Sequence, residues 1–122
     1  MVKLRIGGNE YPLALTVLLL KRLEGKGQSL DTMLDRISPA KMSFSEALGN
    51  AMELLGDLAA AGASQVAALD GASYDAPPTA ELLAAALTPG EVFGLCDAAI
   101  MDGLERRVQA CYEKNGESVA GG

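Results

Sequence analysis

Residues 1–15 read MVKLRIGGNEYPLAL, and this stretch decides the fold class. Apolar and charged residues alternate over Val2–Ile6, with the period of two that is typical of a half-buried strand. The following Gly7–Asn9 tolerates the positive φ angles of a tight hairpin turn. The alternation resumes over Tyr11–Leu15, where Pro12 has no N–H to donate and therefore suits an edge strand. We predict a two-stranded hairpin, which is too small to be stable unless something packs on it.

After residue 15 the apolar period lengthens to that of a helix. Helices are predicted over residues 16–26, 29–37, 43–62, 79–87 and 88–112. Four of them begin at a capping side chain, namely Ser29, Ser43, Thr79 and Thr88. Glu46 and Glu91 each follow a cap by three residues, as in a capping box, and Gly25 and Gly27 end the first helix. The expected fold is α+β and mostly α, with an N-terminal β-hairpin packed on a bundle of four to five helices.

Four of the predicted helices have an apolar stripe that we expect to be buried. The stripes consist of Leu15, Leu18, Leu19 and Leu23; of Leu30, Met33, Leu34 and Ile37; of Phe44, Ala47, Leu48, Ala51, Leu55 and Leu58; and of Val92, Cys96, Ala99, Ile100, Leu104, Val108 and Cys111. Residues 63–79, with their cluster of Gly, Ser, Asp and Pro, predict a loop or linker. We expect a single domain over residues 1–113 and a flexible tail over residues 114–122.

The composition argues against most enzyme chemistry. The chain has 122 residues, of which 49% are apolar and 4% aromatic, and it contains no His. Without His there is no Ser-His or Cys-His nucleophile pair, and a common metal ligand is missing. Asp97, Asp102 and Glu105 lie near one another on the last predicted helix, where a solvated face beside Arg106 is a better interpretation than a metal or acid–base site. We therefore expect no catalytic residue, no cofactor and no metal.

The charge is unevenly distributed along the chain. The formal net charge is −6, which makes a general nucleic-acid surface unlikely to form. Residues 1–41 carry seven Lys and Arg against four Asp and Glu, whereas residues 42–122 carry three against twelve. This split indicates two faces with different partners, head-to-tail contact between copies, or solvated helix faces without a partner. The basic cluster Lys21, Arg22 and Lys26 is expected to dock on an acidic protein face.

The cysteines and the N-terminal residues favour a cytoplasmic protein. Cys96 and Cys111 lie about 22 Å apart on one predicted helix, which is too far for a disulfide between them and suits a reducing compartment. The start Met1–Arg5 does not resemble the apolar core of a signal peptide. The apolar run Leu13–Leu20 is far shorter than the roughly 20 residues needed to span a bilayer. We expect no contact with a membrane.

Gly49 and Gly56 lie one heptad apart on the third predicted helix, in a row with Ala60. Small residues in such a row allow a second helix to approach closely, at some cost in helix propensity. That second helix belongs either to the same molecule, which is the interpretation we favour, or to a partner that binds in the groove.

Several short motifs resemble those of the small phage tail assembly chaperones. The segment IGGNEY (6–11) is similar to the family's I-N-G-K/N-E-Y turn, LKRLE (20–24) to its L-K-R-L-E helix, and GQSLD (27–31) to its G-x-S-L-D/E helix start. The apolar segment 54–62 resembles the second apolar helix of the family, and LTPGEV (87–92) resembles its L-T-x-E-E-V motif. The likeness covers about two thirds of the chain, and residues 63–86 depart from it by being longer and richer in Ala.

The resemblance implies a phage or prophage protein of a long, non-contractile tail, acting in the cytoplasm of the host bacterium. It also implies that the chain coats the apolar, helical tape-measure protein and brings tail-tube subunits to it. The candidate contact residues are Leu18, Leu20, Lys21, Arg22, Gly49, Met52, Gly56 and Met101. The alternative is another small phage structural or adaptor protein, such as a head–tail connector or a tail component, without catalytic activity. A homo-oligomer is expected in both cases.

Overall fold

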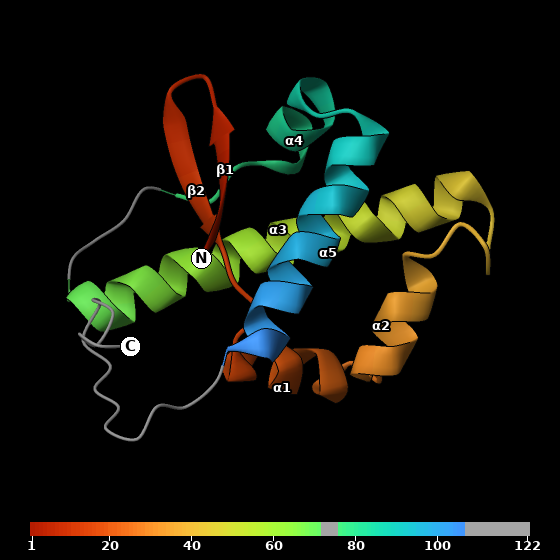
Figure 1. The fold of residues 1–122 in the computed structure, drawn as a ribbon, viewed down its shortest axis with the longest axis horizontal. Coiled ribbons are helices and arrows are strands. Elements are labelled where there is room, and N and C mark those ends of the chain that lie inside the picture. The colour runs from red at the N-terminus through yellow and green to blue at the C-terminus, as the bar shows by residue number, and fades with distance from the viewer. Residues whose placement is uncertain (72–75, 107–122) are drawn as a thin grey trace.

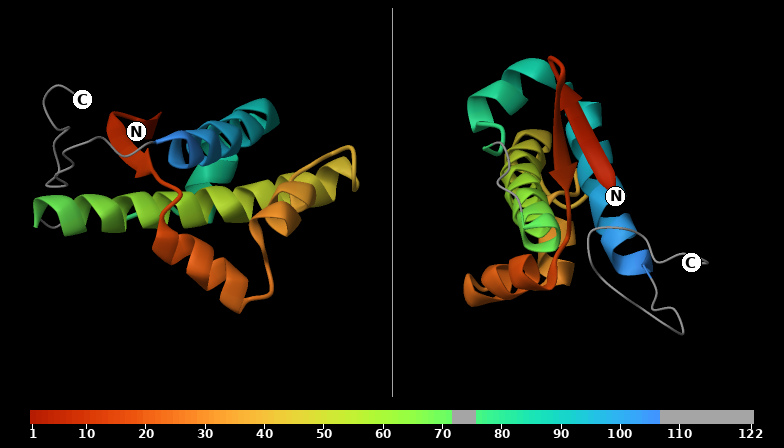
Figure 2. Two further views of the ribbon diagram at one scale, coloured as in Figure 1. Left: turned by 60° about the horizontal axis from the view of Figure 1, so that its bottom comes forward. Right: turned by 90° about the vertical axis from the view of Figure 1, so that its left-hand side faces the viewer.

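The computed structural model describes residues 1–71 and 76–106. Its elements are β1 (Val2–Ile6), β2 (Asn9–Leu13), α1 (Val17–Gly25), α2 (Leu30–Arg36), α3 (Phe44–Asp70), α4 (Ala80–Ala86) and α5 (Pro89–Glu105). The long helix α3 is the central element, and the hairpin and each of the other helices pack against it or against its neighbours (Figure 1). The hairpin and α5 lie on one side of α3, and α1 extends from the other (Figure 2). The predicted α+β, mostly α fold is confirmed.

The hairpin forms as predicted. Strands β1 and β2 pair antiparallel, and Gly7 and Gly8 occupy the turn with φ angles of 56° and 86°. Two successive positive φ angles are the mark of a type I′ turn, whose twist matches that of the flanking strands. Leu4 and Leu13 are buried on the inner face. The hairpin thus gains from the helices the packing that two isolated strands lack.

The end of β2 is attached directly to the backbone of α3. The amide of Ala14 donates a hydrogen bond of 3.1 Å to the carbonyl oxygen of Leu58. One turn further along α3, a Cβ added at Gly62 would collide with the carbonyl group of Pro12. Gly62 is therefore the residue that allows the strand and the helix to approach so closely.

One core joins the hairpin to all five helices among the described residues. Its fully buried members include Leu13 of β2, Leu55 and Leu58 of α3, Leu83 of α4 and Cys96 of α5. The core is almost entirely aliphatic, as the composition predicts, and its small members on α3 let neighbouring elements lie close to that helix.

Most of the helix N-caps and helix ends predicted from the sequence are confirmed. Ser29, Ser43, Thr79 and Thr88 each accept a hydrogen bond from the amide three residues later. Among the described residues, both halves of a capping box form only between Thr88 and Glu91, so the box predicted at Ser43 is present in one half. At the end of α1, Gly27 has a φ of 80°, and the amides of Gly27 and Gln28 return to α1 carbonyls, as in a Schellman motif.

The prediction of a loop over residues 63–79 is wrong for its first part. Helix α3 continues from residue 62 to Asp70 and ends where Gly71 takes a left-handed φ of 67°. The segment is rich in Ala, which has the highest helix propensity, and Gly62 and Ala63 are buried. Burial and propensity together outweigh the turn-forming composition that suggested a loop.

Four side chains predicted to be buried are instead exposed. They are Leu18, Leu34, Phe44 and Leu104, with exposed fractions of 53%, 37%, 54% and 50%. Phe44 is the first residue of α3 and forms an edge-to-face pair with Phe93, with ring centroids 5.8 Å apart. Helix α5 ends at Glu105, where Arg106 becomes extended. Val108, Cys111, the predicted helical residues 107–112 and the predicted tail 114–122 lie outside the described residues.

Candidate protein-binding surfaces

A groove lies between α1 and α3. Thr16 caps α1 beside α3, with its Oγ1 accepting from Leu19 N at 3.2 Å, and the Schellman motif turns the chain after only nine helical residues. The helix diverges from α3 over this length (Figure 2), and the groove encloses about 150 Å³. Its lining consists of Thr16, Leu18, Leu19, Arg22, Leu23, Lys26, Asp57, Ala60, Ala61 and Ser64. We call this site the α1–α3 groove.

The groove has an apolar floor and a cationic rim. Ala60 and Ala61 provide small side chains on α3, and the exposed Leu18 provides a larger one on α1. Arg22 and Lys26 are four residues apart and so lie on the same face of α1. Ion pairs in the described part of the chain involve Lys3, Arg5, Lys41 and Arg106, and none involves the cations of α1.

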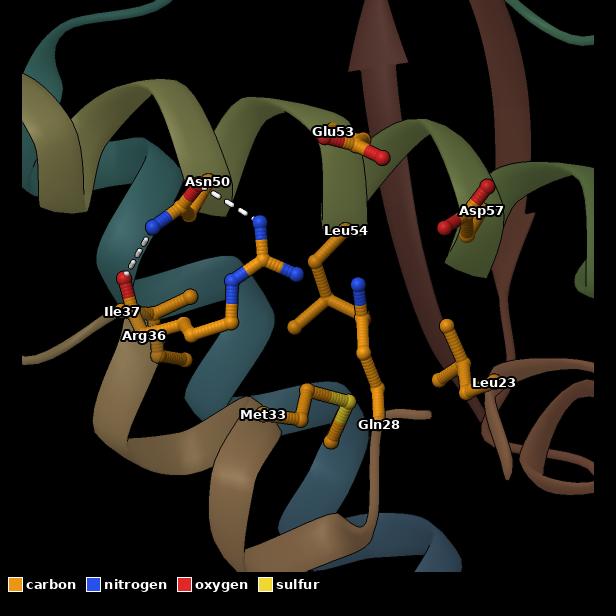
Figure 3. A pocket seen from close by; sticks show the side chains of 9 residues that line it. All are labelled: Leu23, Gln28, Met33, Arg36, Ile37, Asn50, Glu53, Leu54 and Asp57. Atoms are coloured by element: carbon orange, nitrogen blue, oxygen red, sulfur yellow. Dashed lines mark hydrogen bonds between the residues drawn. The ribbon is translucent and has the colours of Figure 1, made fainter. Parts of the chain in front are cut away.

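A second, smaller hollow adjoins the groove where α2 meets α3 (Figure 3). Asn50 closes it by accepting from Arg36 Nη2 at 3.1 Å and donating to the Arg36 carbonyl at 2.8 Å. The same amide nitrogen lies 3.4 Å from Met42 Sδ. This hollow encloses only about 20 Å³ and is held shut by bonds between its own walls, so it serves to fix α2 on α3.

Asp57 lies where the two hollows meet, because its side chain lines both of them. Partial burial raises the pKa of the Asp57 carboxyl, nearby Lys26 lowers it, and the negative charge of Glu53 raises it again. Asp57 and Lys26 therefore interact across the groove.

The solvent-facing side of α5 presents a different surface. Gly94, Asp97, Ala98, Met101 and Glu105 are exposed and recur at the three- and four-residue spacing of one helix face. Met101 is 50% exposed, and a Cβ added at Gly94 would meet no atom within 4 Å. These five residues form what we call the α5 outer face, which is acidic and has an apolar centre.

The candidate contact residues fall into four places. Leu18 and Arg22 line the α1–α3 groove, whereas Leu20 and Lys21 do not. Gly49 and Gly56 lie on α3, with Met52 half-buried between them, and Met101 lies on the α5 outer face. Within residues 1–71 and 76–106, Gly49 and Gly56 admit no helix of the same molecule, contrary to the interpretation we favoured, because a Cβ added at either would meet no atom of these residues within 4 Å. Intramolecular close approach occurs instead at Gly62 and Gly103.

Three residues of the groove were missed by sequence reasoning. Ser64 lies in the segment predicted as a loop, and Ala61 belongs to a run of alanines without a clear period. Asp57 is a carboxylate inside the apolar run Leu54–Leu58, and an isolated charge within such a run is a signal that could have marked it.

The remaining reactive or charged side chains are explained by burial in the core or by ion pairing. Cys96 is buried, and its thiol lies 3.3 Å from the Ala51 carbonyl oxygen; burial, assisted by Asp97, raises the thiol pKa to about 12. A thiol with such a pKa is a structural group rather than a nucleophile. Asp102 pairs with Arg106 at 3.0 Å. Within residues 1–71 and 76–106, no group of three or more His, Cys, Asp and Glu could hold a metal ion.

No single helix in the described part of the chain is long and apolar enough to span a membrane; α4 and α5 reach that length and composition only as a pair, which is bent by 118°. No protein-family model, curated protein or solved structure matches the chain.

Proposed function

We propose that the chain is a phage or prophage tail assembly chaperone, which binds the tape-measure protein and brings tail-tube subunits to it. The observation that supports this function is the open face of α3 around Gly49 and Gly56. A Cβ at either position would meet no atom within 4 Å, so the α3 backbone is accessible to an approaching helix. A client built from long apolar helices needs such a surface.

The side chain of Met52, which lies between Gly49 and Gly56 on α3, suits a client whose residues vary. Met52 is half-buried and lies against the core, and its unbranched thioether can adapt to differently shaped apolar partners. Helix-in-groove recognition of this kind takes its affinity from the apolar stripe of the client and tolerates changes in individual residues. The acidic residues that predominate after residue 41 favour solubility for a chaperone that presents apolar surface.

Co-expression with a phage tape-measure protein tests this function. We expect the tape-measure protein to remain soluble and to co-purify with the wild-type chain. The variant Gly49→Leu adds a bulky side chain at a position where a Cβ meets no described atom within 4 Å, and it should lose the complex. The matched control is Gly90→Leu, which adds the same side chain at another exposed glycine where nothing lies within 4 Å.

A tape-measure protein that aggregates equally with and without the chain would refute the chaperone function. A chain that instead co-purified with head–tail connector or tail components would support the alternative of a structural or adaptor protein. Equal loss of the complex in Gly49→Leu and Gly90→Leu would show that the open face of α3 is not the binding surface.

A further inference from the structure

We propose that the α1–α3 groove of one copy binds the α5 outer face of a second copy, so that the chain associates head to tail. Both surfaces are exposed, both have an apolar centre, and their charges are opposite. Helix α5 lies on one side of α3 and α1 extends from the other (Figure 2), so the two surfaces face different directions within one molecule. Contact between them therefore requires two copies. This inference does not depend on the proposed function.

The apolar parts of the two surfaces fit each other. Met101 is half exposed and follows the small residues Gly94 and Ala98 along the α5 outer face. The floor of the groove consists of Ala60 and Ala61. Small residues on both helices allow their axes to approach to about 8 Å, and a methionine side chain adapts readily to a shallow alanine floor.

The charges are placed to reinforce this contact. Asp97 and Glu105 lie four residues before and after Met101, which is about 6 Å on either side along the helix. With Met101 on the groove floor, a carboxylate is available near Arg22 whichever way the helix runs. Among the described ion pairs neither Asp97 nor Glu105 takes part, whereas Asp102 is held by Arg106.

Arg22 is the cation best placed to receive the second copy. Lys26, the other cation of the groove, already acts on Asp57 across it. An arginine also offers a planar set of donors that can hold both oxygens of one carboxylate. Both cations of the groove are exposed, and Arg22 is the one whose donor geometry best fits a carboxylate from a second copy.

The contact joins two different surfaces, and this determines the kind of assembly. Each copy carries one groove and one α5 outer face, so a pair formed through them still has one of each uncovered. Such heterologous contacts continue into a ring or an open chain rather than stopping at a symmetric dimer. The mass of the assembly should accordingly rise with protein concentration beyond that of two copies.

Sedimentation of two blocked variants tests the proposal. Ala60→Arg places a long cation on the groove floor, at a half-buried position, and Met101→Arg places a cation at an exposed position of the α5 outer face. Both sites lie on helices, and Arg has a high helix propensity. We expect each variant alone to remain at monomer mass. An equimolar mixture should form a one-to-one pair and nothing larger, because only one intact groove and one intact outer face remain to meet.

The matched controls are Ala68→Arg on α3 and Leu82→Arg on α4, which add the same side chain at exposed positions outside both surfaces. Both should associate like the wild type. A wild-type chain that stays at monomer mass at every concentration would overturn the proposal, as would variants that associate normally. A mixture that stays monomeric would also overturn it, because the contact would then be a symmetric one. A groove that binds the tape-measure protein through Ala60 while the chain remains monomeric would assign the groove to the client instead.

Discussion

Gly56 and Gly62 lie six residues apart on α3, and a methyl group added to each would meet opposite surroundings. At Gly62 it would collide with the Pro12 carbonyl, whereas at Gly56 it would meet no atom within 4 Å. We expect Gly62→Ala to lower the free energy of unfolding by about 2 kcal/mol, because backbone rather than a flexible side chain must move. Gly56→Ala should raise it by about 0.5–1 kcal/mol, since Ala is the better helix former. Urea unfolding followed by circular dichroism measures both changes.

A similar effect of the two substitutions would mean that β2 does not approach α3 at Gly62.

The glycines of α3 also show what the sequence can and cannot predict at the residue scale. The heptad spacing identifies Gly49 and Gly56 as a stripe of small residues, and the structure shows that stripe to be open. The close approaches at Gly62 and Gly103 depend on where β2 and Leu15 come to lie, which is a tertiary property that spacing along one helix does not contain.

Asp57 gives a second prediction, which concerns pH. Burial raises the pKa of its carboxyl above the ordinary value of an aspartate, so the folded state binds this proton more tightly than the unfolded state does. The ionised side chain is therefore a source of instability at neutral pH, and this cost disappears as the pH falls through the folded pKa toward about 3.8. We expect Asp57→Asn to stabilise the fold at pH 7 by no more than about 0.5 kcal/mol, since the site is only partly buried.

The difference between Asp57→Asn and the wild type should shrink as the pH is lowered, when both are unfolded with urea at matched concentration. Glu24→Gln, at an exposed position on α1 outside the groove and the α5 outer face, controls for the loss of one carboxylate. A stabilisation that does not change with pH would contradict the assignment, because it would come from packing of the amide rather than from the buried charge.

At the scale of elements, Asn50 joins α3 to α2 by hydrogen bonds, in addition to the apolar packing of Met33 and Ile37. Its amide exchanges two hydrogen bonds with Arg36, one with the guanidinium and one with the carbonyl (Figure 3). Asn50→Ala removes both bonds, and we expect a loss of about 1–2 kcal/mol in the free energy of unfolding. Asn50→Asp keeps an acceptor for the guanidinium and loses the donor, so it should cost less than the alanine variant at neutral pH.

Hydrogen exchange tests this prediction because it reports the stability of α2 and of α5 separately. The amides of α2 should exchange faster in Asn50→Ala than in the wild type, while those in the middle of α5 should change only with the overall stability. Uniform acceleration across α2 and α5 would show that α2 has no separate attachment at Asn50.

The elements themselves are predicted well where the chain carries local signals. The hairpin, the capped starts of four helices and the glycine stop of α1 depend on side chains close in sequence, and they lie where they were expected. The end of α3 was missed because residues 63–70 mix alanine with Gly, Ser and Asp nearby, and their helical state also depends on contact with β2. The same error removed Ser64 from the candidate site, whereas the candidate contacts Arg22 and Met101 are exposed.

For the whole molecule, the net charge of −6 opposes association, whereas the charge of the α1–α3 groove favours it. Two substitutions on α1 separate these effects, because Arg22→Glu and Lys21→Glu change the net charge equally. Arg22 lines the groove and Lys21 does not. If copies associate through the groove, Arg22→Glu should lower the association constant at least about tenfold, as loss of a central charged contact does. Lys21→Glu should lower it by no more than about threefold.

Added salt separates the repulsion between net-charged copies from the contact in the groove, because it screens the two to different extents. Repulsion between net-charged copies acts over distances of 10 Å and more and is screened at about 0.15 M salt, whereas a contact in a partly buried groove is screened much less. The deficit of Lys21→Glu should therefore vanish at moderate ionic strength, while most of the deficit of Arg22→Glu persists. Sedimentation at two salt concentrations measures both deficits. If they vanish together, net charge governs the assembly and Arg22 has no carboxylate partner in it.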